Sequence, residues 1–357
     1  MQMIEEVGAA VAEVPVHAIT LLPSGKAFTS QVGESVLDAA LRQGILLPHQ
    51  CKTGTCGACR ARVVDGEAVC LPGAQPAALS EEEAAQGVHL LCCTQAASPL
   101  HIECAEIPHI PGIAVRKLPV RVVAMERLAP DVMRVQLQPP AGQPRLHYAA
   151  GQYVDVLLPG NRRRSYSLAT PALEGQELLE LHIRHLPGGL FTDQVFGKLK
   201  ARDVLRIEGP FGTFGMHDGA SQAPAILLAS GTGFAPVKAL VEQLLATGSR
   251  RRVHLYWGGR ARADLYLHGL CQEWERALQG RLSYVPVLSD APEADAWAGR
   301  TGWVHQAVLQ DHADLSQHEV YACGAPAMVD AARRDFAAKA GMRPTAFFAD
   351  AFVAQPG

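Results

Sequence analysis

Seven of the nine cysteines in this chain of 357 residues fall between positions 51 and 104. Cys51, Cys56 and Cys59 share one loop, and a fourth thiol follows at Cys92 or Cys93. Structural zinc sites usually pair their ligands roughly two to four residues apart in two separated knuckles, which three thiols in one loop do not match. The spacing is instead typical of the ligands of a [2Fe–2S] cluster. Zinc and simple buried thiols remain the alternative interpretations.

The fourth ligand is open between Cys92 and Cys93. In plant-type ferredoxins the last cysteine follows a Leu-x-Cys step, and Leu90–Cys92 resembles that step. Because a shift of one residue along a strand turns a side chain to the opposite face, only one of the two thiols should point at the cluster. We favour Cys92, and we interpret Cys70 and Cys104 as buried thiols outside the motif.

A second group of residues could bind a flavin nucleotide. Arg164, Tyr166 and Ser167 form an R-x-Y-S motif after a turn. An arginine can pair with a pyrophosphate, a tyrosine ring can pack on an isoalloxazine, and a serine hydroxyl can donate near the flavin N5. The motif alone is weak, since an exposed arginine next to a buried tyrosine is common.

A glycine-containing loop strengthens the flavin interpretation, because it begins at His185, nineteen residues after Tyr166. Glycine amides at the start of a helix can bind an anion, so we expect a second phosphate contact here. The strand before the loop would run along the flavin. The predicted contacts in this stretch are His182, Arg184, Gly188, Gly189, Phe191 and Thr192.

Residues 225–236 predict a buried strand, a tight glycine turn and the start of a helix. Glycines let backbone amides approach a pyrophosphate at the positive end of a helix, and proline suits a first helical turn. A second strand ends at Tyr256–Arg260, which we interpret as a shelf for an adenosine. The predicted nucleotide contacts are Gly231, Thr232, Gly233, Pro236 and Gly258.

Strand and helix patterns indicate the elements that must position these groups. Strands at 16–22 and 26–29 and a helix from Ser35 to about Gly44 precede the cysteine loop, where Gly54 and Gly57 would let the main chain curl around a cluster. Short strands at 120–124, 132–138, 153–158, 178–184 and 204–208 are typical of a small antiparallel barrel.

After Pro224 strands and helices alternate, which is typical of a parallel, doubly wound sheet. The expected strands are 225–229, 253–257, 283–288, 320–323 and 346–348, and the clearest helices are 236–246, 265–279 and 326–339. We therefore predict a multidomain α+β protein. Its expected parts are a tail (1–15), a ferredoxin-like domain (16–105), a Pro-rich linker (106–116), a flavin-binding barrel (117–218) and a nucleotide-binding α/β domain (219–357).

Composition excludes several classes of function. The formal charge of −3 provides no polybasic surface, so nucleic acid and anionic membranes are poor candidate partners. No apolar run approaches the roughly 18 residues that a membrane span needs. The first residues lack the basic start and apolar centre of a signal peptide, which favours the cytoplasm. Oligomeric state is not predicted.

The order of these motifs resembles the ferredoxin–NADP reductase superfamily, and in particular the reductase components of bacterial multicomponent oxygenases. The strongest resemblance is to the family of CDP-6-deoxy-L-threo-D-glycero-4-hexulose-3-dehydrase reductases, also called CDP-6-deoxy-Δ3,4-glucoseen reductases. The stretches that carry it are 21–25, 37–41, 91–93, 163–167, 231–238, 304–309 and 350–353.

The resemblance implies a β-grasp ferredoxin domain, a Greek-key FAD barrel and bound FAD, [2Fe–2S] and NADH. It also implies roles for the C-G-x-x-x-M segment that begins at Cys323, where the cysteine would lie near the nicotinamide C4 and Gly324 would leave room for the cofactor. Asp350 and Phe352 would cover the flavin. Ser167, Cys323 and Asp350 are the expected catalytic residues, and an electron-accepting protein, a sugar dehydratase or an oxygenase component, is the expected partner.

The expected reaction is hydride transfer from NAD(P)H to FAD, followed by single electrons through the cluster. Arg260 and Arg262 could bind the 2′-phosphate of NADPH, but Ser289 and Asp290 offer an acidic group instead, so we favour NADH. Residues 16–105 carry eight acidic and five basic residues, which favours a basic patch on the partner. A redox-sensing protein without turnover and an interaction module with decayed sites are the alternatives from other classes.

Overall fold

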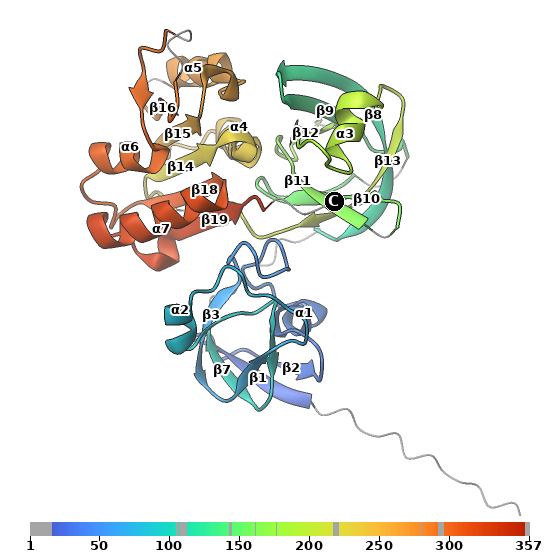
Figure 1. Ribbon diagram of the computed structural model, residues 1–357, viewed down its shortest axis with the longest axis vertical. Coiled ribbons are helices and arrows are strands. Elements are labelled where there is room, and N and C mark those ends of the chain that lie inside the picture. The colour runs from blue at the N-terminus through green and yellow to red at the C-terminus, as the bar shows by residue number, and fades with distance from the viewer. Residues whose placement is uncertain are drawn as a thin grey trace, which may run out of the picture. The chain divides into compact units, whose positions relative to one another are not determined.

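The computed structural model describes residues 16–104, 106, 113–142, 145–160, 162–175, 177–216, 221–278, 280–291 and 296–353. These residues belong to two compact units, divided after residue 107 (Figure 1). The predicted tail at 1–15 lies outside the described residues. Residues 107–112 of the predicted linker lie outside them as well. No described helix is long and apolar enough to cross a membrane.

The first unit is built on a mixed five-stranded sheet with the order β2-β1-β7-β3-β5. Alternate residues of its first strand, Ile19 and Leu21, are fully buried, and the N-cap Ser35 accepts a hydrogen bond from the amide of Asp38 to start the helix that packs beside the sheet. The unit has the β-grasp fold that the family resemblance implied. Its elements are β1 (Val16–Leu22), β2 (Ala27–Gln31), α1 (Val36–Arg42), β3 (Arg60–Asp65), β4 (Ala68–Cys70), α2 (Glu81–Ala85), β5 (Val88–Leu90), β6 (Thr94–Ala96) and β7 (Leu100–Glu103).

The second unit begins with an antiparallel six-stranded barrel of order β11-β10-β13-β8-β9-β12. An isolated bridge between Leu168, directly after β11, and Leu181 of β12 connects the two outer strands. The R-x-Y-S motif lies in β11, after β10 and the turn that follows it, in agreement with the turn predicted before the motif. The elements are β8 (Arg116–Ala129), β9 (Val132–Gln138), β10 (Tyr153–Leu158), β11 (Arg162–Ser167), β12 (Leu179–Arg184), α3 (Thr192–Gly197) and β13 (Val204–Phe211).

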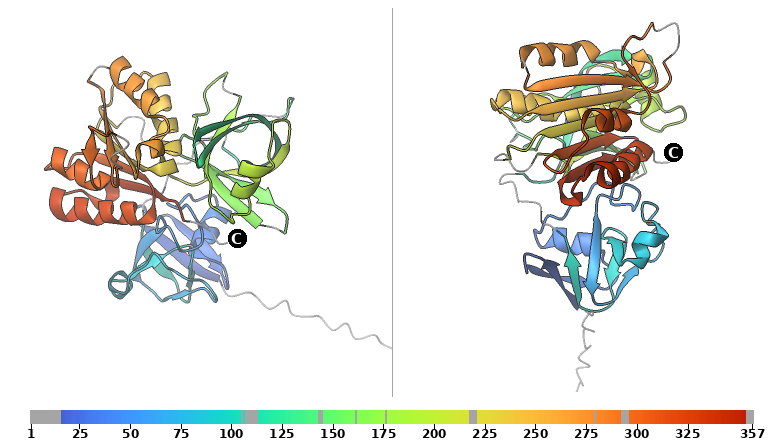
Figure 2. Two further views of the ribbon diagram at one scale, coloured as in Figure 1. Left: turned by 45° about the horizontal axis from the view of Figure 1, so that its top comes forward. Right: turned by 90° about the vertical axis from the view of Figure 1, so that its left-hand side faces the viewer.

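A parallel sheet of order β17-β16-β15-β14-β18-β19 completes the second unit. The strand order reverses between β14 and β18, so the carboxyl ends of these two strands flank a crevice. Helices α4 and α5 cover one face of the sheet, and α6 and α7 cover the other (Figure 2). The strands are β14 (Ala225–Ser230), β15 (Val253–Gly259), β16 (Leu282–Leu288), β17 (Arg300–Thr301), β18 (Glu319–Gly324) and β19 (Phe347–Ala351), and the helices are α4 (Phe234–Ala246), α5 (His268–Ala277), α6 (Val304–Asp311) and α7 (Pro326–Ala340).

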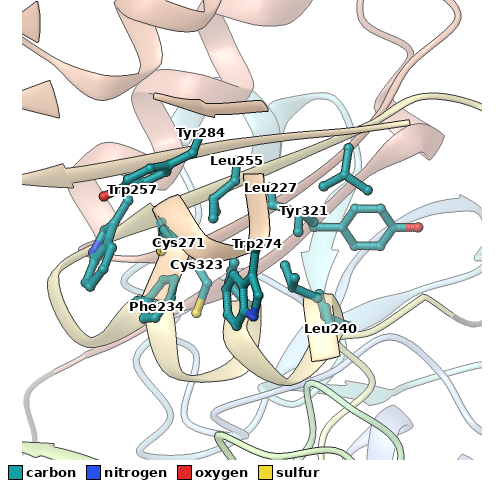
Figure 3. Close-up of a cluster of buried hydrophobic side chains, with 14 of the residues drawn as sticks. Leu227, Phe234, Leu240, Leu255, Trp257, Cys271, Trp274, Tyr284, Tyr321 and Cys323 are labelled. Carbon is teal, nitrogen blue, oxygen red and sulfur yellow. The ribbon is translucent and has the colours of Figure 1, made fainter. Parts of the chain in front are cut away.

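The core under α4 and α5 holds the two strands that flank the crevice (Figure 3). The rings of Phe234 and Trp257 stack with their centroids 3.8 Å apart, and both side chains are fully buried. Stacking of this kind adds to the free energy gained from area burial alone. Cys271 and Cys323 lie fully buried in the same core.

Candidate functional site: an iron–sulfur loop, a flavin strand and a nucleotide cavity

The cysteine loop turns backbone amides toward its own sulfurs. The amides of Thr53 and Cys56 each lie 3.4 Å from the sulfur of Cys51. The sulfur of Cys56 accepts from the amides of Cys51 at 3.4 Å and of Ala58 at 3.5 Å. Amide donors of this kind stabilise the negative charge of thiolate ligands and of a cluster.

Two glycines allow this tight path, as the sequence predicts. Gly54 and Gly57 have positive φ values of 78° and 68°. A Cβ atom on Gly54 would lie 2.6 Å from both the sulfur of Cys93 and the carbonyl oxygen of Gln75. A side chain at that position would therefore displace the main chain that surrounds the thiols.

The four predicted ligands form two pairs. Cys51 and Cys56 form the first pair. Because the Cys56 thiol donates a hydrogen bond to the Cys51 sulfur, the pKa of Cys51 falls to about 4. The sulfur of Cys59 lies 3.3 Å from that of Cys92. Each iron of a [2Fe–2S] cluster takes two protein ligands, so two pairs fit the cluster. Among the described residues no three or more His, Cys, Asp or Glu side chains are grouped closely enough to hold a single metal ion.

The remaining thiols differ in part from expectation. Cys93 is buried and its sulfur lies 3.7 Å from that of Cys92, because residues 91–93 form a turn and not a strand. The alternation of faces that we used to choose between these two cysteines therefore does not apply. Cys104 is buried as predicted, whereas Cys70 is exposed, so the expectation for Cys70 is wrong.

The R-x-Y-S motif places its side chains along β11, opposite β10. Tyr166 pairs with Val154 in the sheet, and its ring lies 5.5 Å from the ring of Phe191. Burial raises the pKa of the Tyr166 phenol, so the hydroxyl stays neutral. Ser167 is buried at the end of the strand, while Arg164 is half-buried, as a charged group at a ligand site would be.

The loop before α3 is closed on itself. The Thr192 hydroxyl donates to the carbonyl of Leu186 over 2.9 Å, and the amide of Gly189 donates to the same carbonyl over 2.8 Å. The amide of Gly188 donates to the carboxylate of Asp193 over 3.1 Å. Both glycine amides thus already have partners, so a phosphate would have to displace Asp193 to reach Gly188. The phosphate contact stays a prediction.

The structure corrects the role expected for His182. Its side chain has no exposed surface, and both ring nitrogens are engaged, with Glu180 at 3.0 Å and with the Tyr266 hydroxyl at 3.0 Å. Burial lowers the pKa of His182, so the ring is neutral. A side chain in this state has neither surface nor polar atoms left for a cofactor, and it contacts the nucleotide-binding half instead.

Arg184 also reaches the nucleotide-binding half. Its guanidinium donates to Asp264 over 2.6 Å, and its Nε lies 3.2 Å from Asp131. A Cβ atom on Gly231 would lie 3.2 Å from Arg184, so the guanidinium sits over the glycine turn. Burial alone would raise the pKa of Asp264, but the amide of Ala261 and the charge of Arg184 hold it below its usual value.

A cavity of about 640 Å³ opens at the carboxyl ends of the parallel strands. A site at this edge is the general location for nucleotides in open α/β sheets. Of the sequence-predicted contacts, the lining includes Arg184, Gly231, Thr232, Gly258, Gly324 and Phe352.

Three predicted contacts are buried beneath the cavity and do not line it. Gly233 allows the glycine turn to approach the end of β18, since a Cβ atom there would lie 2.2 Å from the carbonyl oxygen of Cys323. Pro236 is buried in the first turn of α4. Cys323 is fully buried, and burial raises the pKa of its thiol well above the usual value. Their placement indicates support of the cavity floor.

The last described residues lie along the same edge. Asp350 is buried and pairs with Cys323 in the parallel register of β18 and β19. The amide of Phe352 donates to the carbonyl of Gly324 over 2.7 Å, which holds its side chain in the cavity lining. The segment therefore meets the nucleotide cavity, and the cover over the flavin that the resemblance implied stays a prediction.

The expected adenosine shelf differs from what the structure shows. Tyr256 and Trp257 are buried, and the Trp257 indole donates to the carbonyl of Gly231 over 3.1 Å, so these rings support the glycine turn from below. Sequence reasoning missed Asp264 and the lining from α6 and α7, including Trp303, which is 63% exposed. The A-D-L-Y step after Arg262 is a signal that could have found Asp264.

Three known families match successive parts of the chain. Residues 19–97 match the "2Fe-2S iron-sulfur cluster binding domain", residues 119–216 the "Oxidoreductase FAD-binding domain" and residues 227–334 the "Oxidoreductase NAD-binding domain". Together with the paired thiols, the barrel and the cavity, they define an NAD(P)H-dependent oxidoreductase with FAD and a [2Fe–2S] cluster.

Proteins that align with nearly the whole chain identify the family within this class of oxidoreductases. The chain is 41% identical over 336 residues to the CDP-6-deoxy-L-threo-D-glycero-4-hexulose-3-dehydrase reductase of Yersinia pestis, a match of 94% of this chain and 98% of the relative. It is 35% identical to reductase component 2 of the terephthalate 1,2-dioxygenase of Comamonas sp., over 95% of this chain and 98% of that one. The crystal structure of the Amycolatopsis cytochrome P450 reductase GcoB is similar, with a TM-score of 0.73, 34% identity and coverage of 95% and 99%. The chain belongs to the family of ferredoxin–NADP reductase-type electron-transfer reductases with an N-terminal [2Fe–2S] domain.

Proposed function

We propose that this reductase uses NADH to supply electrons to a dehydrase acting on a CDP-linked 6-deoxy-hexulose. The proposal rests on the 41% identity to the Yersinia pestis protein over nearly the full length of both chains. An oxygenase component is the second candidate partner, and the 35% identity to the Comamonas protein supports it. The difference in identity favours the sugar dehydrase.

The residues fit the three cofactors in separate ways. Cys51, Cys56, Cys59 and Cys92 would hold the cluster as two thiolate pairs. Arg164, Tyr166, Ser167, Phe191 and the loop at 188–192 would hold FAD. The cavity residues named above would hold the nucleotide, with the amides of Gly231 and Thr232 toward its pyrophosphate.

FAD, when bound, supplies the exchange between two-electron and one-electron chemistry. One NADH is oxidised to NAD⁺ and releases one proton, and its two electrons reduce two equivalents of a one-electron acceptor. Ser167 would orient the flavin through its hydroxyl, and Gly324 would leave space for the nicotinamide. Asp350 and Cys323 would support the reacting edge of the site from the buried β18–β19 pair.

NADH is the proposed donor because an acidic group follows the third strand of the sheet. Ser289 and Arg260 line the cavity, and Asp290 is tied to the same loop through its amide, which donates to the carbonyl of Arg260 over 3.0 Å. A carboxylate here favours a ribose hydroxyl over a 2′-phosphate. The ratio of kcat/KM for NADH to that for NADPH tests this, and Asp290→Asn should lower the ratio.

Domain boundaries at 16–105, 117–218 and 219–357 and a cytoplasmic location are also part of the proposal. The three family matches fall inside these boundaries. A reducing compartment keeps thiols available as cluster ligands.

Reduction of cytochrome c and ferricyanide by NADH tests the electron path. Cys59→Ser should abolish cytochrome c reduction and leave ferricyanide reduction largely intact. Equal loss of both activities would contradict independent flavin reduction, and their absence in the intact protein would favour a redox sensor without turnover. Coupling to the purified sugar dehydrase, compared with an oxygenase, then decides the partner.

A further inference from the structure

Three alternate residues of one barrel strand each bond to the nucleotide-binding half. Glu180, His182 and Arg184 lie two residues apart on β12, so their side chains share one face. Their partners are Lys238 at 3.2 Å, Tyr266 at 3.0 Å and Asp264 at 2.6 Å. We call these contacts the β12 ladder.

Lys238 is the most buried cation of the ladder, with 5% of its surface exposed. Its ammonium lies 2.8 Å from Glu242, 3.1 Å from the carbonyl oxygen of Ala169 and 3.2 Å from Glu180. An ammonium has three donors, so these contacts use its full capacity.

The partners of Lys238 connect it to both expected halves of the reaction site. Ala169 follows Ser167 by two residues, and its amide donates to the carbonyl of Glu180 over 2.8 Å, which joins the end of β11 to β12. Lys238 itself lies on α4, which begins directly after the Gly231–Gly233 turn. One side chain thus links the proposed flavin strand to the nucleotide turn.

A buried charge at this place is not explained by stability alone. Removing a lysine and a glutamate from water is costly, and apolar pairs of similar volume are often as stable. Here both charged groups have hydrogen-bond partners. Besides Lys238, Glu180 accepts from His182 over 3.0 Å and from Gln136 over 3.3 Å. Directional bonds fix a separation, which apolar contacts do not.

We propose that Lys238 is a positioning residue that sets the distance and angle between the nicotinamide and the flavin. The other two contacts of the β12 ladder, from His182 and Arg184, hold the orientation of the same two halves. Arg184 also lines the cavity. This inference rests on the proposed placement of FAD against β11. A displacement of about 1 Å at a reacting pair can cost roughly 10²-fold in rate.

The test compares Lys238→Met with the double variant Lys238→Met/Glu180→Gln. The single variant leaves the buried Glu180 carboxylate without its cation, so it can fail to fold. The double variant removes Lys238 together with Glu180 and leaves only the partly exposed Glu242 without its cation, so its melting temperature should stay close to that of the wild type. Lys198→Met, at an exposed barrel position, is the matched control. All are measured as the holoenzyme by single-turnover reduction of FAD with NADH.

The expected result for the double variant is a roughly 10- to 100-fold slower reduction. FAD content and the Kd for NAD⁺ should stay within about threefold, and the long-wavelength charge-transfer absorbance of the stacked rings should weaken. In the apoprotein, hydrogen exchange should rise at residues 168–172 and 234–240. Lys238→Arg should recover part of the rate.

A double variant that reduces FAD at the wild-type rate with unchanged charge-transfer absorbance would overturn the inference, since Lys238 would then serve only to neutralise Glu180 and Glu242. A wild-type protein that binds FAD but takes no hydride from NADH would instead refute the proposed function. The two failures are therefore distinguishable.

Discussion

The sulfur of Cys59 lies 3.3 Å from the sulfur of Cys92, although 33 positions separate the two residues in the chain. By contrast, Cys51 and Cys56 belong to one short loop, and the sulfur of each accepts a hydrogen bond from the backbone amide of the other. One ligand pair is therefore local, and the other depends on the turn between β5 and β6.

Replacing Cys92 should have a larger effect than replacing Cys93. We expect Cys92→Ser to lose the [2Fe–2S] absorbance and most bound iron, because its thiol is the one next to Cys59. Cys93→Ser should retain both, although its sulfur lies only 3.7 Å from that of Cys92. Iron analysis and electron paramagnetic resonance of the reduced proteins check this. The reverse order of iron loss would assign the ligand to Cys93.

Trp257→Phe should weaken nucleotide binding without unfolding the protein. The variant keeps a ring to stack on Phe234 but loses the indole hydrogen bond to Gly231. Loss of one such bond, about 0.5–1.5 kcal/mol, should raise the Kd for NADH about two- to tenfold. Titration calorimetry measures it. Trp274→Phe, in the same core, is the control, and an equal effect of both would argue against a role of the indole bond.

Gly233→Ala should destabilise the second unit. The new methyl group would meet the carbonyl of Cys323 at 2.2 Å and force the glycine turn away from the end of β18. Overpacking of this kind costs about 1–3 kcal/mol, which thermal unfolding will show as a lower melting temperature. Gly269→Ala in α5 is the matched control, because open space surrounds it and alanine favours helix. If both variants melt alike, the close approach of the glycine turn to β18 is not limiting.

Three histidines on the amino-terminal side of the sheet should make stability depend on pH. The ring of His254 lies 4.8 Å from that of His312, which lies 5.1 Å from that of His318. Burial, and then the two neighbouring rings, lower the pKa of His254 to about 4. Since the folded pKa is below the unfolded value of 6.5, the stabilising contribution is complete above about pH 6.5 and is lost as the pH falls toward 4.

The melting temperature of the second unit should therefore fall between pH 6.5 and pH 4, even after the opposing effect of Asp311. The rise in FAD fluorescence as the protein unfolds on heating measures this melting temperature. His254→Asn should flatten the dependence, because asparagine can keep a bond to Ser283, which lies 2.8 Å from the histidine nitrogen. His147→Asn, at an exposed position, should leave the curve unchanged. An unaltered slope in His254→Asn would refute the prediction.

Local patterns predicted the elements well and the contacts between distant segments less well. The strands at 132–138 and 153–158 agree with the structure to the residue, because alternation along a half-buried strand is written in consecutive positions. The short strand β17 and helix α6 carry weak periodicity and were missed. The cysteine loop was predictable because its chemistry is local.

His182 shows where sequence reasoning ended. A polar residue on a strand near a flavin motif suggests a ligand contact, but its partner, Tyr266, lies 84 positions away, in the turn before α5. Trp257 is similar, since an aromatic residue at a strand end can face a ligand or stack beneath it. Only the tertiary packing of Phe234 against it decides between the two.

Asp264 bonds Arg184 through one oxygen and the amides of Arg260 and Ala261 through the other. The same carboxylate thus shapes a wall of the nucleotide cavity and ties that wall to the barrel. If a nucleotide strengthens the contact between Asp264 and Arg184, thermodynamic reciprocity requires this contact to tighten nucleotide binding by the same factor. Nucleotide binding and the contact between the barrel and the nucleotide-binding half would then be thermodynamically coupled.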